Sequence, residues 1–151
     1  MIRIALSFAL FALATAATGQ VTVKDPWVRA TVPAQRATAA FMQLVAAQGT
    51  RLVAASSPVA GMAEIHEMSM VDGVMKMRAI KALDLPAGKA VVLDPGGYHV
   101  MLLELKSQVR VGDVVPLTLV FEDRENRRTT VDVKAPVRAL AEAPAPGMPM
   151  K

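Results

Sequence analysis

Short strand-like runs, each closed by turn residues, are the feature that most restricts the fold of this 151-residue chain. The expected strands are Val21–Lys24, Thr38–Val45, Leu52–Ala55, Glu64–Met70, Val74–Ile80, Ala90–Leu93, Tyr98–Leu105, Val114–Phe121 and Thr129–Lys134. Several short strands at this spacing predict an all-β sandwich or barrel. Residues 34–47 could also be read as a helix, but the adjacent apolar residues Phe41 and Met42 favour a strand.

The N-terminus has the pattern of a secretory signal peptide. Arg3 supplies a positive charge, residues 4–14 are apolar or small, and small residues continue to Gly19. We expect residues 1–16 to be removed after Ala16, with Gly19 as the other candidate cleavage site. A permanent anchor is the alternative, but the apolar run is shorter than the about 20 residues that span a bilayer. We therefore expect export to a bacterial periplasm, with no membrane span after cleavage.

Composition narrows the classes of protein that remain. The chain has no cysteine, a net charge of +4 and few aromatic residues. Disulfides cannot support the exported domain, which we expect at residues 20–138, but about 120 residues can bury a sufficient core. The basic residues are scattered, which excludes the basic stripe with stacking platforms that nucleic-acid binding requires. We expect a monomer that binds no nucleic acid.

The C-terminal residues 139–151 differ in composition from the rest of the chain. Alanine and proline alternate there, which prevents regular strand pairing, so we expect a flexible tail. Met148 and Met150 lie in this tail. The tail is either an ordinary chain end or an arm whose thioethers help to capture a metal.

Methionines gather around the first of the chain's two histidines. Asp72-Gly73 is a strong signal for a two-residue hairpin turn. With these residues at the turn, Met68 lies opposite Met77 and Met70 opposite Met75. Because side chains alternate faces, the sulfurs share one face with His66. His66 and Met77 become diagonal neighbours with Cα atoms about 7–8 Å apart, so a metal ion could bridge their side chains.

The second histidine also has a methionine at strand spacing. His99 and Met101 share one face of a strand, about 6.6 Å apart along it. Pro95-Gly96-Gly97 places His99 at the start of this strand, near a loop end of the sandwich. If this strand approaches the hairpin, the His66–Met77 and His99–Met101 pairs converge into one site with two nitrogen and two sulfur donors.

Core packing is the other explanation for the methionines, since methionine often fills protein cores. Five of the ten methionines fall in residues 62–77, however, and strand cores are usually built from β-branched and aromatic side chains. We therefore favour metal binding and assign only Met42 and Met62 to the core. Imidazole and thioether donors suit Cu(I), and the absence of cysteine excludes a blue-copper site. The affinity for Cu(I) should decrease as the pH falls below the imidazole pKa of about 6.5.

The spacing of these residues resembles the signature of the periplasmic copper chaperone family PCuAC, His-x10-Met-x21-His-x-Met. His66, Met77, His99 and Met101 match it without a gap, and the context matches at residues 25–30 and 93–102. The resemblance implies a cupredoxin-like, Greek-key β-sandwich that binds one Cu(I) through these four side chains. Met68 fits the additional methionine often seen beside the first histidine, and Met75 is a further auxiliary candidate. The tail has no histidine, so no second, Cu(II)-type site is expected.

The family resemblance also implies a role. Its members are associated with delivery of copper to the CuA centre of cytochrome c oxidase, alone or alongside Sco-type proteins. We expect copper to move by ligand exchange, with no catalysis by the chain. A copper storage or detoxification protein, or a metal-free adhesion or assembly sandwich, are the alternatives. A copper enzyme of the polysaccharide-cleaving type would need a histidine at the mature N-terminus, and none is present there.

Overall fold

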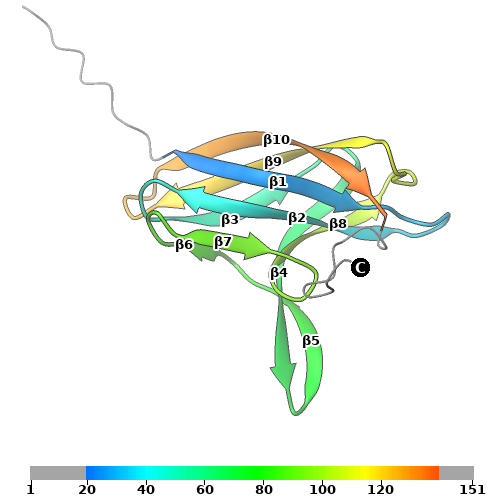
Figure 1. The fold of residues 1–151 in the computed structure, drawn as a ribbon, viewed down its shortest axis with the longest axis horizontal. Coiled ribbons are helices and arrows are strands. Elements are labelled where there is room, and N and C mark those ends of the chain that lie inside the picture. The colour runs from blue at the N-terminus through cyan, green and yellow to red at the C-terminus, as the bar shows by residue number, and fades with distance from the viewer. Residues whose placement is uncertain (1–19, 140–151) are drawn as a thin grey trace, which may run out of the picture.

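The computed structural model describes residues 20–139, which fold into ten β-strands (Figure 1). The strands are β1 (Val21–Arg29), β2 (Ala37–Ala46), β3 (Thr50–Ser56), β4 (Ala60–Val71), β5 (Val74–Ala79), β6 (Leu83–Leu85), β7 (Ala90–Leu93), β8 (His99–Leu105), β9 (Val114–Asp123) and β10 (Arg128–Arg138). The expected signal peptide and the tail with Met148 and Met150 lie outside the described residues, apart from Ala139.

The strands form one hydrogen-bonded path in the order β5-β4-β8-β2-β1-β10-β9-β3-β6, and β7 pairs with β2. β1 and β10 run parallel, and the other named pairs are antiparallel. The path folds over so that its two halves face each other across one core (Figure 1). The predicted all-β sandwich is thereby confirmed. Residues 20–139 contain no helix that could cross a membrane.

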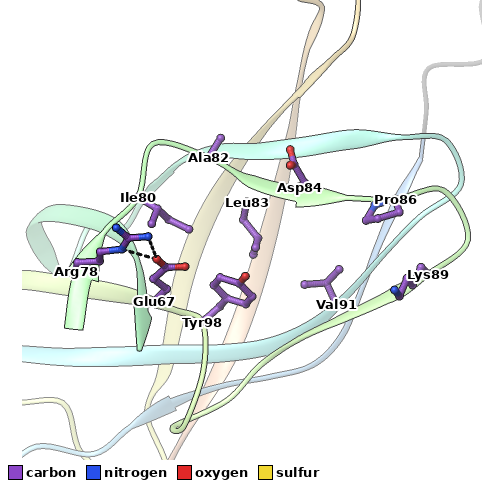
Figure 2. Close-up of a pocket in the computed structure, with 10 residues that line it drawn as sticks. All are labelled: Glu67, Arg78, Ile80, Ala82, Leu83, Asp84, Pro86, Lys89, Val91 and Tyr98. Carbon is purple, nitrogen blue, oxygen red and sulfur yellow. Dashed lines mark hydrogen bonds and ion pairs between the residues drawn. The ribbon is translucent and has the colours of Figure 1, made fainter. Parts of the chain in front are cut away.

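The β4–β5 hairpin projects from the sandwich body, as Figure 1 shows. Asp72 and Gly73 occupy its turn with φ values of 50° and 77°, the left-handed conformation that a type I′ turn requires at both positions. The register is the predicted one, with Met70 opposite Met75 and Met68 opposite Met77. On the other face Glu67 and Arg78 form an ion pair (Figure 2). A local turn signal therefore aligned the two methionine-bearing strands.

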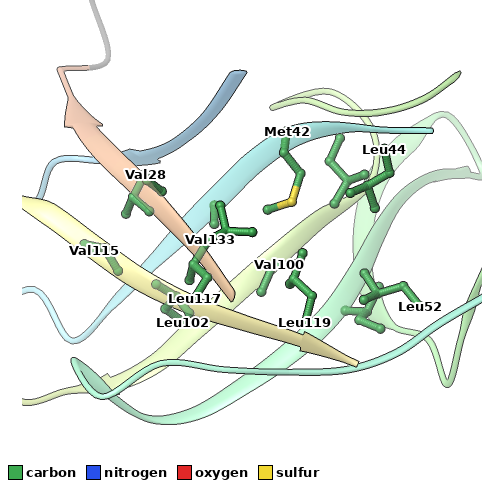
Figure 3. Packing of buried hydrophobic residues seen from close by; sticks show 14 of the residues in the cluster. Val28, Met42, Leu44, Leu52, Val100, Leu102, Val115, Leu117, Leu119 and Val133 are labelled. Carbon is green, nitrogen blue, oxygen red and sulfur yellow. The ribbon is translucent and has the colours of Figure 1, made fainter. Parts of the chain in front are cut away.

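The core lies between the two halves of the folded sheet (Figure 3). β8 contributes Val100 and Leu102, and β9 contributes Leu117 and Leu119 from the opposite half; none is more than 1% exposed. Alternate residues of these strands point inward because successive side chains leave a strand on opposite sides. Burying each such side chain contributes roughly 1.5–3 kcal/mol to the hydrophobic stabilisation of the fold. The remaining faces of the strands are free to carry other chemistry.

The structure differs from the sequence-based expectation at several strand ends. β1 continues past Lys24 to Arg29 through an irregularity in its pairing with β2, where Asp25 has a φ of 47°. β6 was not expected, because its three residues are too few to show a periodicity; it is recognised by its pairing with β3. Residues 34–47 contain strand β2, and the helical alternative is wrong.

Met42 and Met62 behave differently, although we expected both in the core. Met42 is 2% exposed and belongs to the core, whereas Met62 is 46% exposed. Met62 lies four residues before His66 on β4 and therefore shares the outer face of that strand. The assignment of Met62 to the core is wrong because its side chain leaves β4 on the outer face, which the second half of the sandwich does not cover.

Candidate metal centre

The two histidines face each other across neighbouring strands. β4 and β8 pair antiparallel, and His66 lies directly opposite His99. Their ring centroids are 5.6 Å apart. The neighbouring residues Ile65 and Val100 point into the core, so both imidazoles lie on the outer face of the sheet. The structure thus brings the two predicted nitrogen donors together at the base of the hairpin.

Met77 joins the histidines from β5. It lies opposite Met68, one diagonal step from His66, as the hairpin register predicts. Its Sδ atom is 3.1 Å from Nε2 of His99. The side chain of Met77 is 48% exposed, whereas His66 and His99 are only 8% and 4% exposed. The site therefore has a buried imidazole floor and a thioether open to the solvent.

Met101 occupies the next outer position on β8. It lies opposite Glu64 of β4 on one side and Ala39 of β2 on the other, and it is partly buried. It shares the face of His99, two residues along the strand, as expected. Among the auxiliary candidates, Met68 lies opposite Met77, and the partly exposed Met75 lies nearer the hairpin tip. Met148 and Met150 are beyond the described residues.

Glu64 fixes the orientation and the tautomer of His66. Its Oε2 atom is 2.7 Å from Nε2 of His66. A carboxylate only accepts hydrogen bonds, so Nε2 of His66 carries the proton and donates it. The other ring nitrogen, Nδ1, then bears a lone pair, and it is buried with no hydrogen-bond partner in the described chain. A histidine that gives one N–H to a carboxylate and keeps the other nitrogen free is arranged as metal ligands are.

The turn before β8 orients His99 in a corresponding way. The carbonyl of Gly97 accepts a hydrogen bond from Nδ1 of His99 at 3.2 Å and one from the backbone N–H of Met68 at 3.2 Å. This leaves the lone pair on Nε2 of His99 facing the sulfur of Met77. Two electron-rich atoms at that distance are favourably placed when a cation lies between them.

Burial keeps His99 in its neutral form. Desolvation lowers the pKa of His99, and the nearby His66 and Arg29 lower it further, against an opposing contribution from the Gly97 hydrogen bond. Protonation of Nε2 would supply the donor that the sulfur of Met77 lacks, but the lowered pKa disfavours it. The neutral imidazole, which is the metal-binding form, is thus favoured near pH 7.

An aromatic group covers the site on the β2 side. Phe41 is 2% exposed although it lies outside the core cluster. Its ring centroid is 4.6 Å from that of Trp27 and 6.3 Å from that of His99, and the Arg29 guanidinium lies 5.5 Å from it. This stack restrains the His99 ring and excludes water from one side of the site.

The donor set determines which metals the site could hold. Residues 20–139 contain no group of three or more His, Cys, Asp or Glu side chains placed to hold a metal. Any metal here therefore depends on the thioethers together with the two imidazoles. Thioethers are soft ligands, which favours Cu(I) over Mg²⁺, Ca²⁺ or Mn²⁺.

A cavity of about 330 Å³ lies on the other side of the hairpin (Figure 2). Glu67 and Arg78 line it, and these residues leave β4 and β5 on the face opposite His66 and Met77. Its lining contains neither a histidine nor a methionine. The cavity is therefore separate from the candidate metal centre.

Two residues that contact the histidines of the candidate metal centre were not identified from the sequence. Glu64 precedes His66 by two residues, a spacing that places both side chains on one strand face and could have indicated the contact. Phe41 had no such signal, because its approach to His99 depends on the pairing of β2 with β8.

One family model and two curated proteins are similar in sequence to this chain. The model of the family described as "Putative lipoprotein LpqE-like" matches residues 21–137. The "Putative lipoprotein Lxx21020" of Leifsonia xyli subsp. xyli is 30% identical over 115 residues, which cover 76% of this chain and 69% of that protein. The "Uncharacterized protein RP573" of Rickettsia prowazekii is 32% identical over 116 residues, which cover 73% of this chain and 63% of that protein.

Solved PCuAC domains have the same fold. The copper-bound PCuAC domain from PmoF2 superposes with a TM-score of 0.62 at 26% identity, covering 82% of this chain and 96% of that domain. The Cu(I) form of DR1885 from Deinococcus radiodurans superposes with a TM-score of 0.60 at 34% identity, covering 83% of each chain. The resemblance to PCuAC domains is thereby confirmed, while the individual ligands stay a prediction.

Proposed function

This chain belongs to the LpqE-like family and shares the fold of PCuAC domains, and from this premise we propose that it is a Cu(I)-binding metallochaperone. One observation carries the proposal: His66 and His99 face each other across β4 and β8, with the Met77 sulfur 3.1 Å from Nε2 of His99. The similar domains of known structure include copper-bound forms, which agrees with this assignment.

The ligands of the proposed site are His66, Met77, His99 and Met101. Each histidine has one nitrogen occupied by an oxygen acceptor and one left with a lone pair, as a metal ligand requires. Met101 completes the set from the next outer position of β8, with Met68 and Met75 as reserve thioethers. A d10 ion such as Cu(I) has no strong geometric preference from its d electrons and accommodates this uneven set.

Copper leaves by ligand exchange in this mechanism. The Met77 thioether is half-exposed, so an incoming donor from a partner displaces it before the two buried imidazoles. Cu(I) is then shared between the two proteins at every stage, and the chain performs no catalysis. The recipient we propose is the apo CuA domain of cytochrome c oxidase or a Sco-type copper protein, and the donor chain acts as a monomer.

The N-terminal sequence, the family model and one relative named as a putative lipoprotein support export of the chain. Residues 1–16 act as a signal peptide in this proposal, with cleavage as late as Gly19 as the alternative. The copper-binding domain, residues 20–138, then operates in the periplasm, and residues 139–151 form its tail.

Titration of the apo protein with Cu(I) against a competing chelator tests the site. We expect one tightly bound copper and a loss of affinity of more than about 100-fold in His66→Ala and in His99→Ala. Removal of a residue that only hydrogen-bonds to a ligand typically costs about 10- to 100-fold, and loss of the ligand itself should cost more. Met62→Leu is the control, since Met62 lies exposed on the same face of β4 as His66 but on the far side of Glu64. Unchanged binding in both histidine variants would exclude the proposed site.

Transfer to an apo CuA domain tests the role separately. Mixing the Cu(I)-loaded chain with the apo domain should transfer copper to the acceptor faster than a Cu(I)–chelator complex does. Tight binding of several copper ions per chain without transfer would instead indicate storage or detoxification, and no copper binding would leave the metal-free assembly role.

A further inference from the structure

A second pair of thioethers lies beyond the candidate centre, near the tip of the hairpin. Met70 of β4 lies directly opposite Met75 of β5. The two side chains are 64% and 47% exposed. Directly opposed residues have Cβ atoms about 4.5–5.5 Å apart, so two flexible thioethers in this arrangement can reach one ion.

The tip pair is continuous with the candidate centre. Met70 and Met75 lie one step of two residues, about 6.8 Å, from the Met68–Met77 pair. Met77 in turn contacts Nε2 of His99. On this face of the hairpin, each cross-strand pair between the turn and His66 therefore consists of two sulfurs.

Packing does not account for these methionines. All six residues of β5 are exposed, and the hairpin projects from the sandwich (Figure 1). The opposite face carries Ser69, Lys76 and the Glu67–Arg78 ion pair, with the exposed Val71–Val74 pair next to the turn. A water-facing strand is normally polar or β-branched, so a face made only of thioethers indicates a ligand for soft donors.

We propose that Met70 and Met75 form a second, weaker Cu(I) site through which copper enters and leaves the histidine centre. This inference rests on the proposed function. Cu(I) moves from the tip pair to Met68 and Met77 and then to the imidazoles, exchanging one thioether at a time. Copper keeps its oxidation state, and no proton moves, because thioethers carry none. The two-sulfur site binds less tightly than the centre, so the ion is passed on and not retained.

Silver(I), a redox-inert analogue of Cu(I), is the probe for the tip site. The ε-methyl resonances of the methionines and the ring resonances of both histidines are followed by NMR during its addition to the full apo chain. We expect the first equivalent to shift the His66 and His99 rings and the second to shift the methyls of Met70 and Met75. In a His66→Ala/His99→Ala variant the tip methyls should still shift. Absence of any shift at Met70 and Met75 in both proteins would overturn the second site.

Kinetics test the relay. Stopped-flow transfer of Cu(I) from the loaded protein to a coloured Cu(I) chelator should slow by at least about tenfold in Met70→Leu/Met75→Leu, because the tip pair no longer raises the local concentration of ligands. Met62→Leu is the control and should transfer at the wild-type rate. An unchanged transfer rate in the double variant would overturn the relay. So would a lower affinity of the double variant for its first Cu(I), because the pair would then belong to the centre itself.

The outcome separates this inference from the proposed function. If the first equivalent leaves both histidine rings unperturbed, the metal centre itself is wrong, whatever the tip methyls do. If the rings respond but the tip methyls or the transfer rate do not, the centre stands and the relay alone is lost.

Discussion

The sandwich body and the β4–β5 hairpin follow the same alternation of side chains but use it for different purposes. In the body, one face of each strand is buried, as with Leu117 and Leu119 of β9. In the hairpin, all of β5 is exposed; one face carries thioethers, and the other carries the Glu67–Arg78 ion pair, Lys76 and two exposed valines. The comparison teaches that the body stabilises the fold, whereas the hairpin presents donor atoms to the solvent. Exposed thioethers contribute little to the free energy of unfolding, but they are accessible for ligand exchange.

The largest expected effect comes from exchanging one residue in each region. Leu117→Ala should lower the free energy of unfolding by about 2–5 kcal/mol, because it leaves a cavity in a well-packed core. Met75→Ala should change it by no more than about 0.5 kcal/mol, since the side chain is half-exposed. Urea denaturation of the apo protein measures both. Equal losses would show that the hairpin contributes to the stability of the body.

Glu64 tests the boundary between the two regions, where the hairpin leaves the sheet. Glu64→Gln keeps the shape of the side chain but removes the negative charge that orients His66 and increases its basicity. We expect Cu(I) affinity to fall about tenfold, with little change in the unfolding midpoint. Chelator competition gives the affinity, and Glu122→Gln, a carboxylate paired with Arg51 away from the site, is the control. An equal effect of both substitutions would remove Glu64 from a positioning role.

The smallest expected effect is the pH dependence of the apo fold. The pKa of His99 is lowered in the folded protein by burial, so the unfolded chain binds a proton there that the folded chain resists. The stabilising contribution is therefore complete above the unfolded pKa of about 6.5 and is lost as the pH falls toward the lower folded value. One group changes stability by at most about 1.4 kcal/mol per pH unit.

Denaturation between pH 7.5 and 5 measures this dependence. His99→Asn should flatten the profile in this window, because its amide can still donate to the Gly97 carbonyl but does not titrate. Interference from Glu122 and Asp123 is small there, since arginine partners and backbone hydrogen bonds lower their pKa values. A profile that is as steep in the variant as in the wild type would assign the dependence to another group.

Local patterns predicted the parts of the fold that depend on neighbouring residues. The Asp72-Gly73 turn sets the register of β4 and β5, so the alignment of Met68 with Met77 followed from the sequence. The three residues of β6 gave no usable period, and their strand is defined by pairing with β3. Met62 was misplaced because the alternation gives two faces but does not say which one the second half of the sandwich covers.

The sequence by itself determined the donor types, their spacing and the face of the hairpin on which the sulfurs lie. Only the tertiary structure decided that β8 pairs with β4, so that His99 meets His66, and that Glu64 and Gly97 each occupy one ring nitrogen. The physical reason is range. Side-chain alternation and tight turns depend on adjacent residues, whereas the pairing of distant strands depends on how the whole chain buries its apolar faces.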